Sequence, residues 1–518
     1  MTTAGALLAE ARPSRYDAWM AALRADPRRM RLFGVLAPIL VTLLAAVLRL
    51  VRLGDPHALV FDETYYVKDA WSQWNLGYPA TWPDGANEQF VAGDTGVFLS
   101  SGSYVVHPPL GKWLIGLGMW AFGPDSSFGW RVSAAVAGTA TVLVLYLLAR
   151  TLTRSVVLAT VAAGLFAIDG LAIVTSRVSL LDGFLTLFVV LAFWFVLLDR
   201  DRHVRRLEAA LAPHGPDEPP RAWGPVLWGR PWLVAAGAAA GAAAAVKWSG
   251  AIVLVALGLY VLVTDALARR RAGVGFWPAD AVRQGVASFL LLVPVAFVVY
   301  LASWTGWLVT EGGYSREAAA SAPATGLWSW VPLSLQSLWK YHQSMYSFHA
   351  GLSSPHSYAS PAWQWPLLVR PTSMYWQQSD GTVQAISSIP NPLIWWGGVA
   401  AAILLVYRFV VTRSPAYGFV LTGIAATYLP WPFYPERTMF QFYTVVMMPF
   451  LVLALALALR EIAGATSADA RRRTAGQRVV VVFLVAAVVL SAFWYPVWTA
   501  LPVPYDFWRL HNWFPAWI

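Results

Sequence analysis

Long apolar segments constrain the fold of this chain more than any other feature. Its 518 residues are 58% hydrophobic and only 12% charged, with a mean hydropathy of +0.54. Eleven segments predict membrane spans, although several are shorter than the roughly 20 residues of a straight spanning helix and fit tilted or broken spans. The predicted spans are 33–53, 132–148, 156–174, 180–198, 232–246, 251–267, 285–303, 393–407, 417–433, 438–459 and 479–498. We therefore expect an all-α polytopic membrane protein.

The distribution of basic residues predicts the orientation of the chain. With the N-terminal tail 1–32 inside, the inside segments hold 25 of the 37 Lys and Arg residues, as the positive-inside rule requires. This bias explains the pI of 9.8, so no nucleic-acid partner is expected. An odd number of spans places the tail 499–518 outside. The first span lacks a small-residue cleavage site and predicts a retained anchor in a multi-pass cell-membrane protein.

Two long segments lie outside in this topology. The first, 54–131, belongs to a transmembrane module over 33–303, and the second, 304–392, precedes the C-terminal spans within 393–498. Neither has room for a soluble domain of ordinary size. Within the first, the apolar segment 110–122 is too short to span and predicts a helix lying in the membrane interface.

An acidic pair, Asp62 and Glu63, follows the first span closely. It lies a few residues outside the membrane, where two ionisable acids can serve a reaction between a lipid-borne donor and an acceptor in water. The alternative interpretation of the pair alone is an exposed acidic turn.

Further charged residues lie at the outside ends of spans, where such residues are candidates for function. They are Arg131, Asp169, Arg177, Asp182, Lys247, Glu436 and Arg437. Arg177 and Asp182 are also consistent with an ion pair that closes a hairpin. Lys247 separates two apolar stretches and needs an anion, either a lipid phosphate or a buried carboxylate. Lys112, in the first turn of the 110–122 helix, fits either phosphate binding or a snorkelling interfacial anchor.

The order of these motifs resembles the protein O-mannosyltransferases, a family of GT-C membrane glycosyltransferases. The matching pieces are Phe61-Asp62-Glu63-Thr64-Tyr65-Tyr66, His107-Pro108-Pro109-Leu110-Gly111-Lys112, Arg131, Asp169, Ser176-Arg177, Leu180-Leu181-Asp182, Lys247-Trp248-Ser249-Gly250, Ser357-Tyr358, Trp363-Gln364-Trp365-Pro366-Leu367-Leu368 and Arg370-Pro371. Eukaryotic members carry a β-trefoil module in the late outside loop, which 304–392 cannot hold. The chain thus resembles the shorter bacterial members, and its Ala- and Arg-rich composition suits an actinobacterium.

The resemblance implies transfer of mannose from a polyprenyl-phosphate carrier to Ser or Thr hydroxyls of proteins, expected to be under translocation, at the outer membrane face. It also implies one displacement that inverts the anomeric centre. A hydroxyl is a poor nucleophile until a base accepts its proton, and we assign Asp62 as this base. Glu63 is expected to organise the site or contact the acceptor. The leaving phosphate departs as an anion, so cations rather than an acid should hold it.

The remaining candidate residues divide into two groups. The donor phosphate is expected to bind Arg131 first, then Lys247, with Lys112, Arg370 and Arg437 as further candidates. Structural or substrate-binding roles are expected for His107, Asp169, Arg177, Asp182, Trp363 and Trp365. No cofactor is expected. Five outside histidines (His57, His107, His342, His349 and His356) match no recognised metal pattern, and the chain has no cysteine, so no metal is expected either.

Two other functions share part of this pattern. A GT-C transferase that adds arabinose or aminoarabinose to a lipid or glycan shares the fold and the early acid, but the motif over 363–371 favours protein mannosylation. A transporter of lipid-linked sugar would place ionisable groups at the bilayer midplane and often shows repeat symmetry. Here the charged candidates gather at one face and no repeat is apparent, which favours an enzyme.

Overall fold

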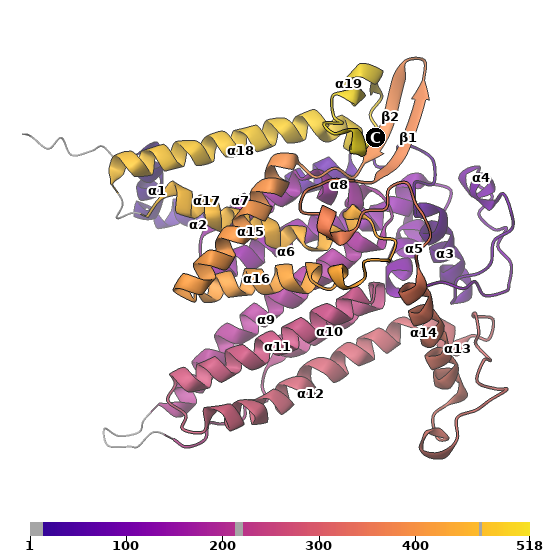
Figure 1. Ribbon diagram of the computed structural model, residues 1–518, viewed down its shortest axis with the longest axis horizontal. Coiled ribbons are helices and arrows are strands. Elements are labelled where there is room, and N and C mark those ends of the chain that lie inside the picture. The colour runs from indigo at the N-terminus through magenta and orange to yellow at the C-terminus, as the bar shows by residue number, and fades with distance from the viewer. Residues whose placement is uncertain (1–13, 213–220, 466–468) are drawn as a thin grey trace, which may run out of the picture.

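The computed structural model describes residues 14–212, 221–465 and 469–518, and these residues form a long helical bundle (Figure 1). The α-helices are α1 (Arg15–Ala25), α2 (Pro27–Leu50), α3 (Glu63–Leu76), α4 (Ala86–Val91), α5 (Leu110–Phe122), α6 (Ser127–Thr153), α7 (Val156–Ala167), α8 (Gly170–Arg177), α9 (Leu181–Leu211), α10 (Pro231–Val246), α11 (Ser249–Arg271), α12 (Trp277–Ser303), α13 (Thr305–Val309), α14 (Leu333–Gly351), α15 (Pro392–Thr412), α16 (Pro415–Tyr428), α17 (Met448–Ala463), α18 (Ala470–Trp498) and α19 (Tyr505–Arg509). The strands are β1 (Ser373–Ser379), β2 (Thr382–Ser387) and β3 (Val503–Pro504).

Each of the eleven predicted spans falls on helical structure, which confirms the all-α class. Within the described ranges, seven helices are long and apolar enough to cross a membrane: α2, α6, α9, α11, α12, α15 and α18. Helices α7 and α8 meet at a 59° bend and can form an eighth, broken span. The other predicted spans fall on the shorter helices α10, α16 and α17, so a count of eleven crossings stays a prediction.

The bundle has inner and outer helices. Two thirds of the apolar window is buried in α6 and α9, whereas only 17% is buried in α2 and α18. Helices α10 and α12 pack closely because small residues line their contact. A Cβ atom added at Gly237 or Gly241 would collide with the backbone of Leu292 or Ala296, as is common where membrane helices approach each other.

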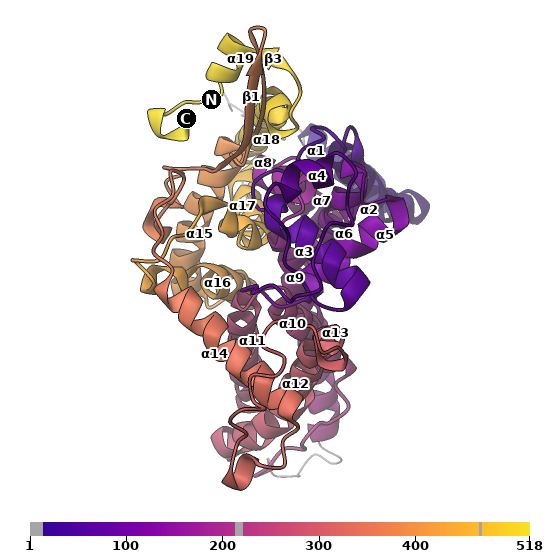
Figure 2. The ribbon, with the colours of Figure 1, turned by 90° about the vertical axis from the view of Figure 1, so that its right-hand side faces the viewer.

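Short elements collect at one end of the bundle. Helices α3, α4, α5, α13 and α14 lie there with the hairpin β1–β2 (Figures 1 and 2). Helix α5 has the predicted bounds: Pro109 precedes it, and Gly123 ends it with a φ of +91°, a conformation that glycine adopts without strain. Residues 304–392, predicted too short for a trefoil module, contain α13, α14 and this hairpin.

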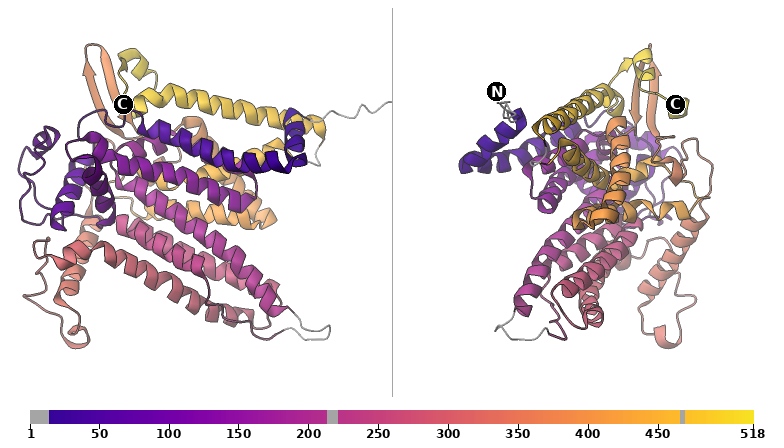
Figure 3. Two further views of the ribbon diagram at one scale, coloured as in Figure 1. Left: turned by 180° about the vertical axis from the view of Figure 1, so that it is seen from behind. Right: turned by 60° about the vertical axis from the view of Figure 1, so that its left-hand side comes forward.

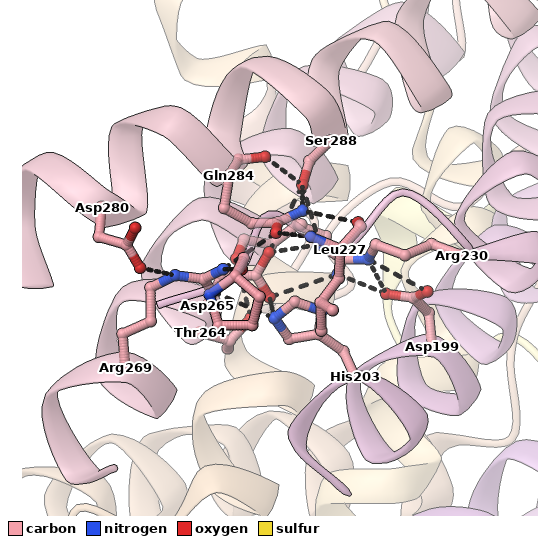
Figure 4. Close-up of polar contacts among 12 residues, drawn as sticks. Asp199, His203, Leu227, Arg230, Thr264, Asp265, Arg269, Asp280, Gln284 and Ser288 are labelled. Carbon is pink, nitrogen blue, oxygen red and sulfur yellow. Dashed lines mark hydrogen bonds and ion pairs between the residues drawn. The ribbon is translucent and has the colours of Figure 1, made fainter. Parts of the chain in front are cut away.

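A second group of buried charges, which the sequence analysis did not single out, lies at the far end of α9 and α11. Figure 4 shows Arg230 between Asp199 and Asp265, with N···O distances of 2.5 Å to each. Arg269 pairs with Asp280 at 2.8 Å. These contacts tie the segment before α10 to α9, α11 and α12, so each buried charge has a partner. Figure 1 and the view from behind in Figure 3 (left) show α9, α11 and α12 diverging from the rest of the bundle toward this end.

Candidate active site

Asp62 precedes α3, and its carboxylate is not used to cap that helix. The side chain is partly buried. Burial raises the pKa of Asp62 to about 6, while the Lys247 ammonium and the Tyr66 side chain oppose the shift and Asp182 adds to it. Asp62 is thus ionised at neutral pH yet basic enough to accept a proton, which suits a general base.

Glu63, the next residue, has a different environment. It is fully buried and forms a bidentate pair with Arg131, both N···O distances being 2.8 Å. Its carboxylate also accepts the backbone N–H groups of Val60 at 2.9 Å and Ser179 at 2.8 Å. Glu63 therefore ties the start of α3 to α6 and to the turn between α8 and α9. These contacts fit the predicted organising role and leave little of the carboxylate for an acceptor.

The contacts of Arg131 argue against its predicted phosphate role. Besides Glu63, its guanidinium donates to the backbone oxygens of Leu53, Pro56 and Ala58 at 3.3, 2.9 and 2.8 Å. All five N–H donors of an arginine are thereby used inside the protein. A phosphate contact would have to break one of these bonds, so we revise the prediction to a structural ion pair.

Lys247 and Asp182 form the second charged pair near Asp62. Nζ of Lys247 donates to Oδ2 of Asp182 at 2.7 Å and lies 4.7 Å from the ring centre of Tyr443. Lys247 has an extended backbone between α10 and α11, because the chain leaves one helix and enters the next at this residue. One bond to Asp182 leaves two of the three ammonium donors for a ligand.

The suggested ion pair between Arg177 and Asp182 is not formed. Arg177 instead donates to the backbone oxygens of Arg49, Val51 and Arg52 at 2.9, 2.8 and 3.0 Å. These carbonyls lie at and just after the C-terminal end of α2, where they have no hydrogen-bond partner within the helix. The guanidinium supplies that partner, and its positive charge interacts favourably with the negative end of the helix dipole. Asp182 is left to Lys247.

Two adjoining cavities meet at Lys247. Both are lined by Lys247, Ser249, Ile252, Pro430, Trp431 and Tyr443. The outer cavity, of about 170 Å³, is also lined by His107, His349 and Arg437. The inner cavity, of about 30 Å³, continues past Asp182 to apolar residues such as Leu185 and Val189. The cationic lining of the outer cavity fits a phosphate, whereas the inner cavity has room for only about two water molecules.

The histidines of the outer cavity are held neutral. Nη2 of Arg437 donates to Nδ1 of His349 at 3.2 Å, and Nε2 of His349 lies 2.7 Å from the Val106 oxygen. His349 therefore carries its proton on Nε2. His107 stacks on His349 with 5.2 Å between ring centres. Burial and the nearby cations, Lys247 foremost, hold the pKa of His107 well below its usual range.

Arg437 was a minor candidate from the sequence, and the structure places it better than Arg131. It lines the outer cavity, and its Nε is buried without a hydrogen-bond partner in the structure. A buried guanidinium donor without a partner costs free energy, so an anionic ligand that reaches it would be bound favourably. Arg437 also lies over the Trp431 ring at 5.7 Å.

Lys112 and Arg370 do not line either of the two cavities at Lys247. Lys112 is 1% exposed and lies 3.7 Å from Asp69, which argues against contact with headgroups and against snorkelling. Arg370 donates to the oxygens of Ser357 at 3.0 Å and Ile518 at 2.9 Å. Both cations therefore serve the packing of the outer segments, and we no longer place them at the phosphate.

Three further predicted residues have contacts that clarify their roles. Asp169 caps α8 through Ala172 at 3.1 Å and accepts the Asn391 N–H at 2.9 Å, which is a structural role. Trp365 is buried against Trp431 and supports the cavity wall. Trp363, by contrast, is 63% exposed.

Sequence reasoning overlooked the aromatic residues of the site. Tyr66, Trp248, Trp431 and Tyr443 surround Lys247 and the nearby histidines. Tyr66 lies within the motif at 61–66 and Trp248 within the motif at 247–250. Membership of these motifs was the sequence signal that could have identified both residues. As for metal, the described parts of the chain contain no group of three His, Cys, Asp or Glu placed to bind an ion, and metal-independent chemistry stays a prediction.

Comparison with known proteins identifies the family. Residues 39–209 match the model described as dolichyl-phosphate-mannose-protein mannosyltransferase, and residues 334–517 match the C-terminal four-TMM region of protein-O-mannosyltransferase. A polyprenol-phosphate-mannose–protein mannosyltransferase of Mycobacterium tuberculosis is 35% identical over 504 residues, which cover 94% of this chain and 92% of the relative. The chain belongs to the protein O-mannosyltransferase family. It is a membrane glycosyltransferase that transfers mannose to proteins.

Other relatives agree with this assignment to the protein O-mannosyltransferases. The Corynebacterium glutamicum enzyme of the same name is 31% identical over 474 residues, 88% of each chain. The solved Pmt1–Pmt2 complex of Saccharomyces cerevisiae, bound to its sugar donor, has a chain that superposes with a TM-score of 0.71 at 16% identity. That match covers 98% of this chain and 95% of the yeast chain. It confirms the predicted GT-C fold.

Proposed function

We propose that this mannosyltransferase uses polyprenyl-phosphate mannose as donor and Ser or Thr hydroxyls as acceptors. The observation that carries the proposal is that Asp62, a base with a pKa of about 6, lies within electrostatic reach of Lys247. Lys247 in turn lines the outer cavity together with Arg437 and the apolar Ile252. Relatives named for polyprenol-phosphate mannose support this donor.

The donor phosphate binds between Lys247 and Arg437 in this proposal. Both side chains line the outer cavity, and each retains donors that the protein does not use. Asp182 holds Lys247 in place through their 2.7 Å bond. The prenyl chain leaves the phosphate beside the apolar side chains of Ile252 and Pro430, which line the same outer cavity. Two cations neutralise the charge that grows on the leaving phosphate oxygen.

Asp62 accepts the proton of the acceptor hydroxyl. The hydroxyl oxygen attacks C1 of mannose from the face opposite the phosphate and forms the new C–O bond. The bond between C1 and the phosphate oxygen breaks, and its electron pair leaves with polyprenyl phosphate. One displacement inverts C1 and needs one base, unlike the two-carboxylate scheme of retaining hydrolases. Neutral His107 offers an uncharged hydrogen-bonding group to the sugar, and His349 stacks against the His107 ring.

The reaction is proposed to take place at the outer face of the cell membrane, on acceptor proteins during translocation. The bias of Lys and Arg toward the opposite segments supports this orientation. Asp62 and the exposed Trp363 both belong to segments at the end of the bundle where α3 and the hairpin lie (Figure 2). A peptide in the surrounding water can therefore approach Asp62 while the donor stays in the membrane.

A competition between acceptors tests this function. Purified protein in lipid nanodiscs receives labelled polyprenyl-phosphate mannose with a Ser/Thr-rich peptide, the same peptide with Ala at each Ser and Thr, or a glycolipid acceptor. We expect label in the Ser/Thr peptide alone, with inverted configuration at C1. Label in the glycolipid would instead support the lipid or glycan transferase. Movement of intact donor across a vesicle membrane without any transfer would support the transporter.

A further inference from the structure

A large cavity lies away from the catalytic end and has no part in the mechanism above. It has a volume of about 980 Å³, between the C-terminal halves of α9 and α11 and the facing ends of α15 and α16. Its lining includes the cations Arg200, Arg271 and Arg413 and the apolar residues Leu267, Phe409 and Leu421. The volume is at the upper end of the range for ligand sites, about 300–1,000 Å³.

The position of this cavity along α9 separates it from the donor phosphate. Asp182, the partner of Lys247, and Arg200 lie eighteen residues apart on α9, which corresponds to about 27 Å at the rise of an α-helix. The hydrocarbon core of a bilayer is about 30 Å thick. The arginines of the cavity therefore lie at the headgroup layer opposite to the one that holds Lys247.

Aromatic rings lie between the two sites. Phe419 of α16 contacts Phe193 of α9 with 5.5 Å between ring centres and Tyr260 of α11 with 5.7 Å. These three helices line the inner catalytic cavity on one side of the contact and the large cavity on the other. A donor whose phosphate is bound at Lys247 thus does not account for the large cavity.

The charges of the large cavity select an anion. Arg200 is held by the Tyr260 hydroxyl and by Asp201, both at 3.0 Å. Arg271 and Arg413 have no ion pair in the residues that the structure describes. Glu208 is the acidic residue among the described lining residues, so three cations face one anion. The adjacent walls are apolar, and three of the helices that form them, α9, α11 and α15, are long and apolar enough to cross a membrane.

We propose that this cavity binds an anionic phospholipid of the leaflet opposite the catalytic site. Its phosphate lies between Arg271 and Arg413, which can each donate two hydrogen bonds to it. Its acyl chains pack along Leu267, Phe409 and Leu421. The lipid joins α9 and α11 to α15 and α16 where the protein alone leaves a gap. The proposal does not depend on the reaction catalysed at the other end.

Lipid retention measures this binding directly. The full-length protein is reconstituted in nanodiscs of phosphatidylcholine with a minor fraction of phosphatidylglycerol, extracted with mild detergent, and analysed by native mass spectrometry for bound lipid. We expect phosphatidylglycerol to be retained well above its share of the bilayer. Arg271→Ala with Arg413→Ala should lower that retention by about tenfold or more, since each basic residue adds substantially to the attraction of anionic lipid.

A matched control removes two arginines that do not line the cavity. Arg270 stacks on Trp277 at 5.6 Å, and Arg478 is exposed on α18. Arg270→Ala with Arg478→Ala should retain phosphatidylglycerol as the wild type does. Ala425→Trp, which fills the cavity without changing charge, should also lose the lipid, and thermal unfolding shows which variants are folded.

The outcomes separate the sources of the bound lipid. Equal retention in the wild type and the Arg271/Arg413 variant would overturn the proposal, as would equal loss in the Arg270/Arg478 control. Retention of phosphatidylcholine to the same degree would show a site without preference for anionic lipid and would also contradict it. Release of polyprenyl phosphate rather than phosphatidylglycerol from protein expressed in its native membrane would assign the cavity to the carrier instead.

Discussion

The Glu63 carboxylate pairs with the Arg131 guanidinium at 2.8 Å, one residue after Asp62. The two adjacent acids therefore have separate tasks. Glu63 fixes the start of α3 to α6, and Asp62 keeps a carboxylate that faces the charges of Lys247 and Asp182. A rigid neighbour is a direct way to hold a catalytic base in position.

Breaking this pair should destabilise the protein. Arg131→Ala leaves Glu63 buried without its counter-charge, and removal of one partner of a buried ion pair costs about 3–5 kcal/mol. We expect a clear loss of thermal stability in detergent. Arg52→Ala, which removes an exposed pair with Asp55, is the control and should have almost no effect. An Arg131→Ala protein that unfolds like the wild type but needs far more donor would restore the phosphate role.

Arg437→Gln should weaken donor binding while the fold is retained. Hydrogen bonds to charged groups contribute about 1.5–3 kcal/mol, which corresponds to roughly a 10–100-fold rise in the donor concentration at half-saturation. Arg370→Gln is the matched control because Arg370 contacts backbone oxygens away from the cavity. Saturation curves with labelled donor measure both. An unchanged curve for Arg437→Gln would remove this residue from the phosphate site.

The rate of transfer should fall as the pH falls through about 6. Asp62 accepts a proton only when ionised, and burial raises its pKa to about 6, so kcat/KM loses about tenfold for each pH unit below that value. The raised pKa of Asp62 affects the stability of the fold in the opposite direction to the rate, because stability falls as the pH rises. The folded state binds the Asp62 proton more tightly than the unfolded state, so this group stabilises the fold at low pH and loses that contribution as pH rises from about 4 to 6. A profile that is flat from pH 5 to pH 8 would contradict the assignment.

Transfer should not require a metal ion. Lys247 and Arg437 supply the positive charge that a metal would otherwise bring to the phosphate. Activity measured in excess chelator should equal that in untreated samples. Loss of activity that returns when a divalent ion is added would show that these side chains are not sufficient.

The sequence predicts the positions of the helices well because a bilayer demands long apolar segments. It also predicts α5, since Pro108-Pro109 and Gly123 bound an apolar segment too short to span. The hairpin β1–β2 was overlooked, although Asp380-Gly381, both with positive φ, is a strong hairpin signal. The bend between α7 and α8 lies at Asp169, whose side chain caps α8 through the Ala172 N–H, and hydropathy does not describe such a cap.

The partners of charged residues were harder to predict than their importance. Arg131 meets Glu63 from 68 residues away, and Lys247 meets Asp182 from 65 residues away. Hydropathy places all four residues at the same end of the bundle. It does not show which cation uses all its N–H donors in hydrogen bonds within the protein and which keeps donors free for a ligand. Arg131 was therefore preferred and Arg437 undervalued. The buried pairs around Arg230 and Arg269 were missed for the same reason, because they resembled ordinary charges of inside loops.

The most direct test of the account is the single-turnover rate of mannose transfer by Asp62→Asn. The purified variant is loaded with labelled polyprenyl-phosphate mannose and mixed with excess Ser/Thr-rich peptide, beside the wild type and the surface control Asp55→Asn. Loss of a general base lowers rates by about 10²–10⁴-fold. We predict a fall of that size for Asp62→Asn with normal donor binding and thermal stability, and a wild-type rate for Asp55→Asn. Transfer by folded Asp62→Asn at close to the wild-type rate would contradict the account.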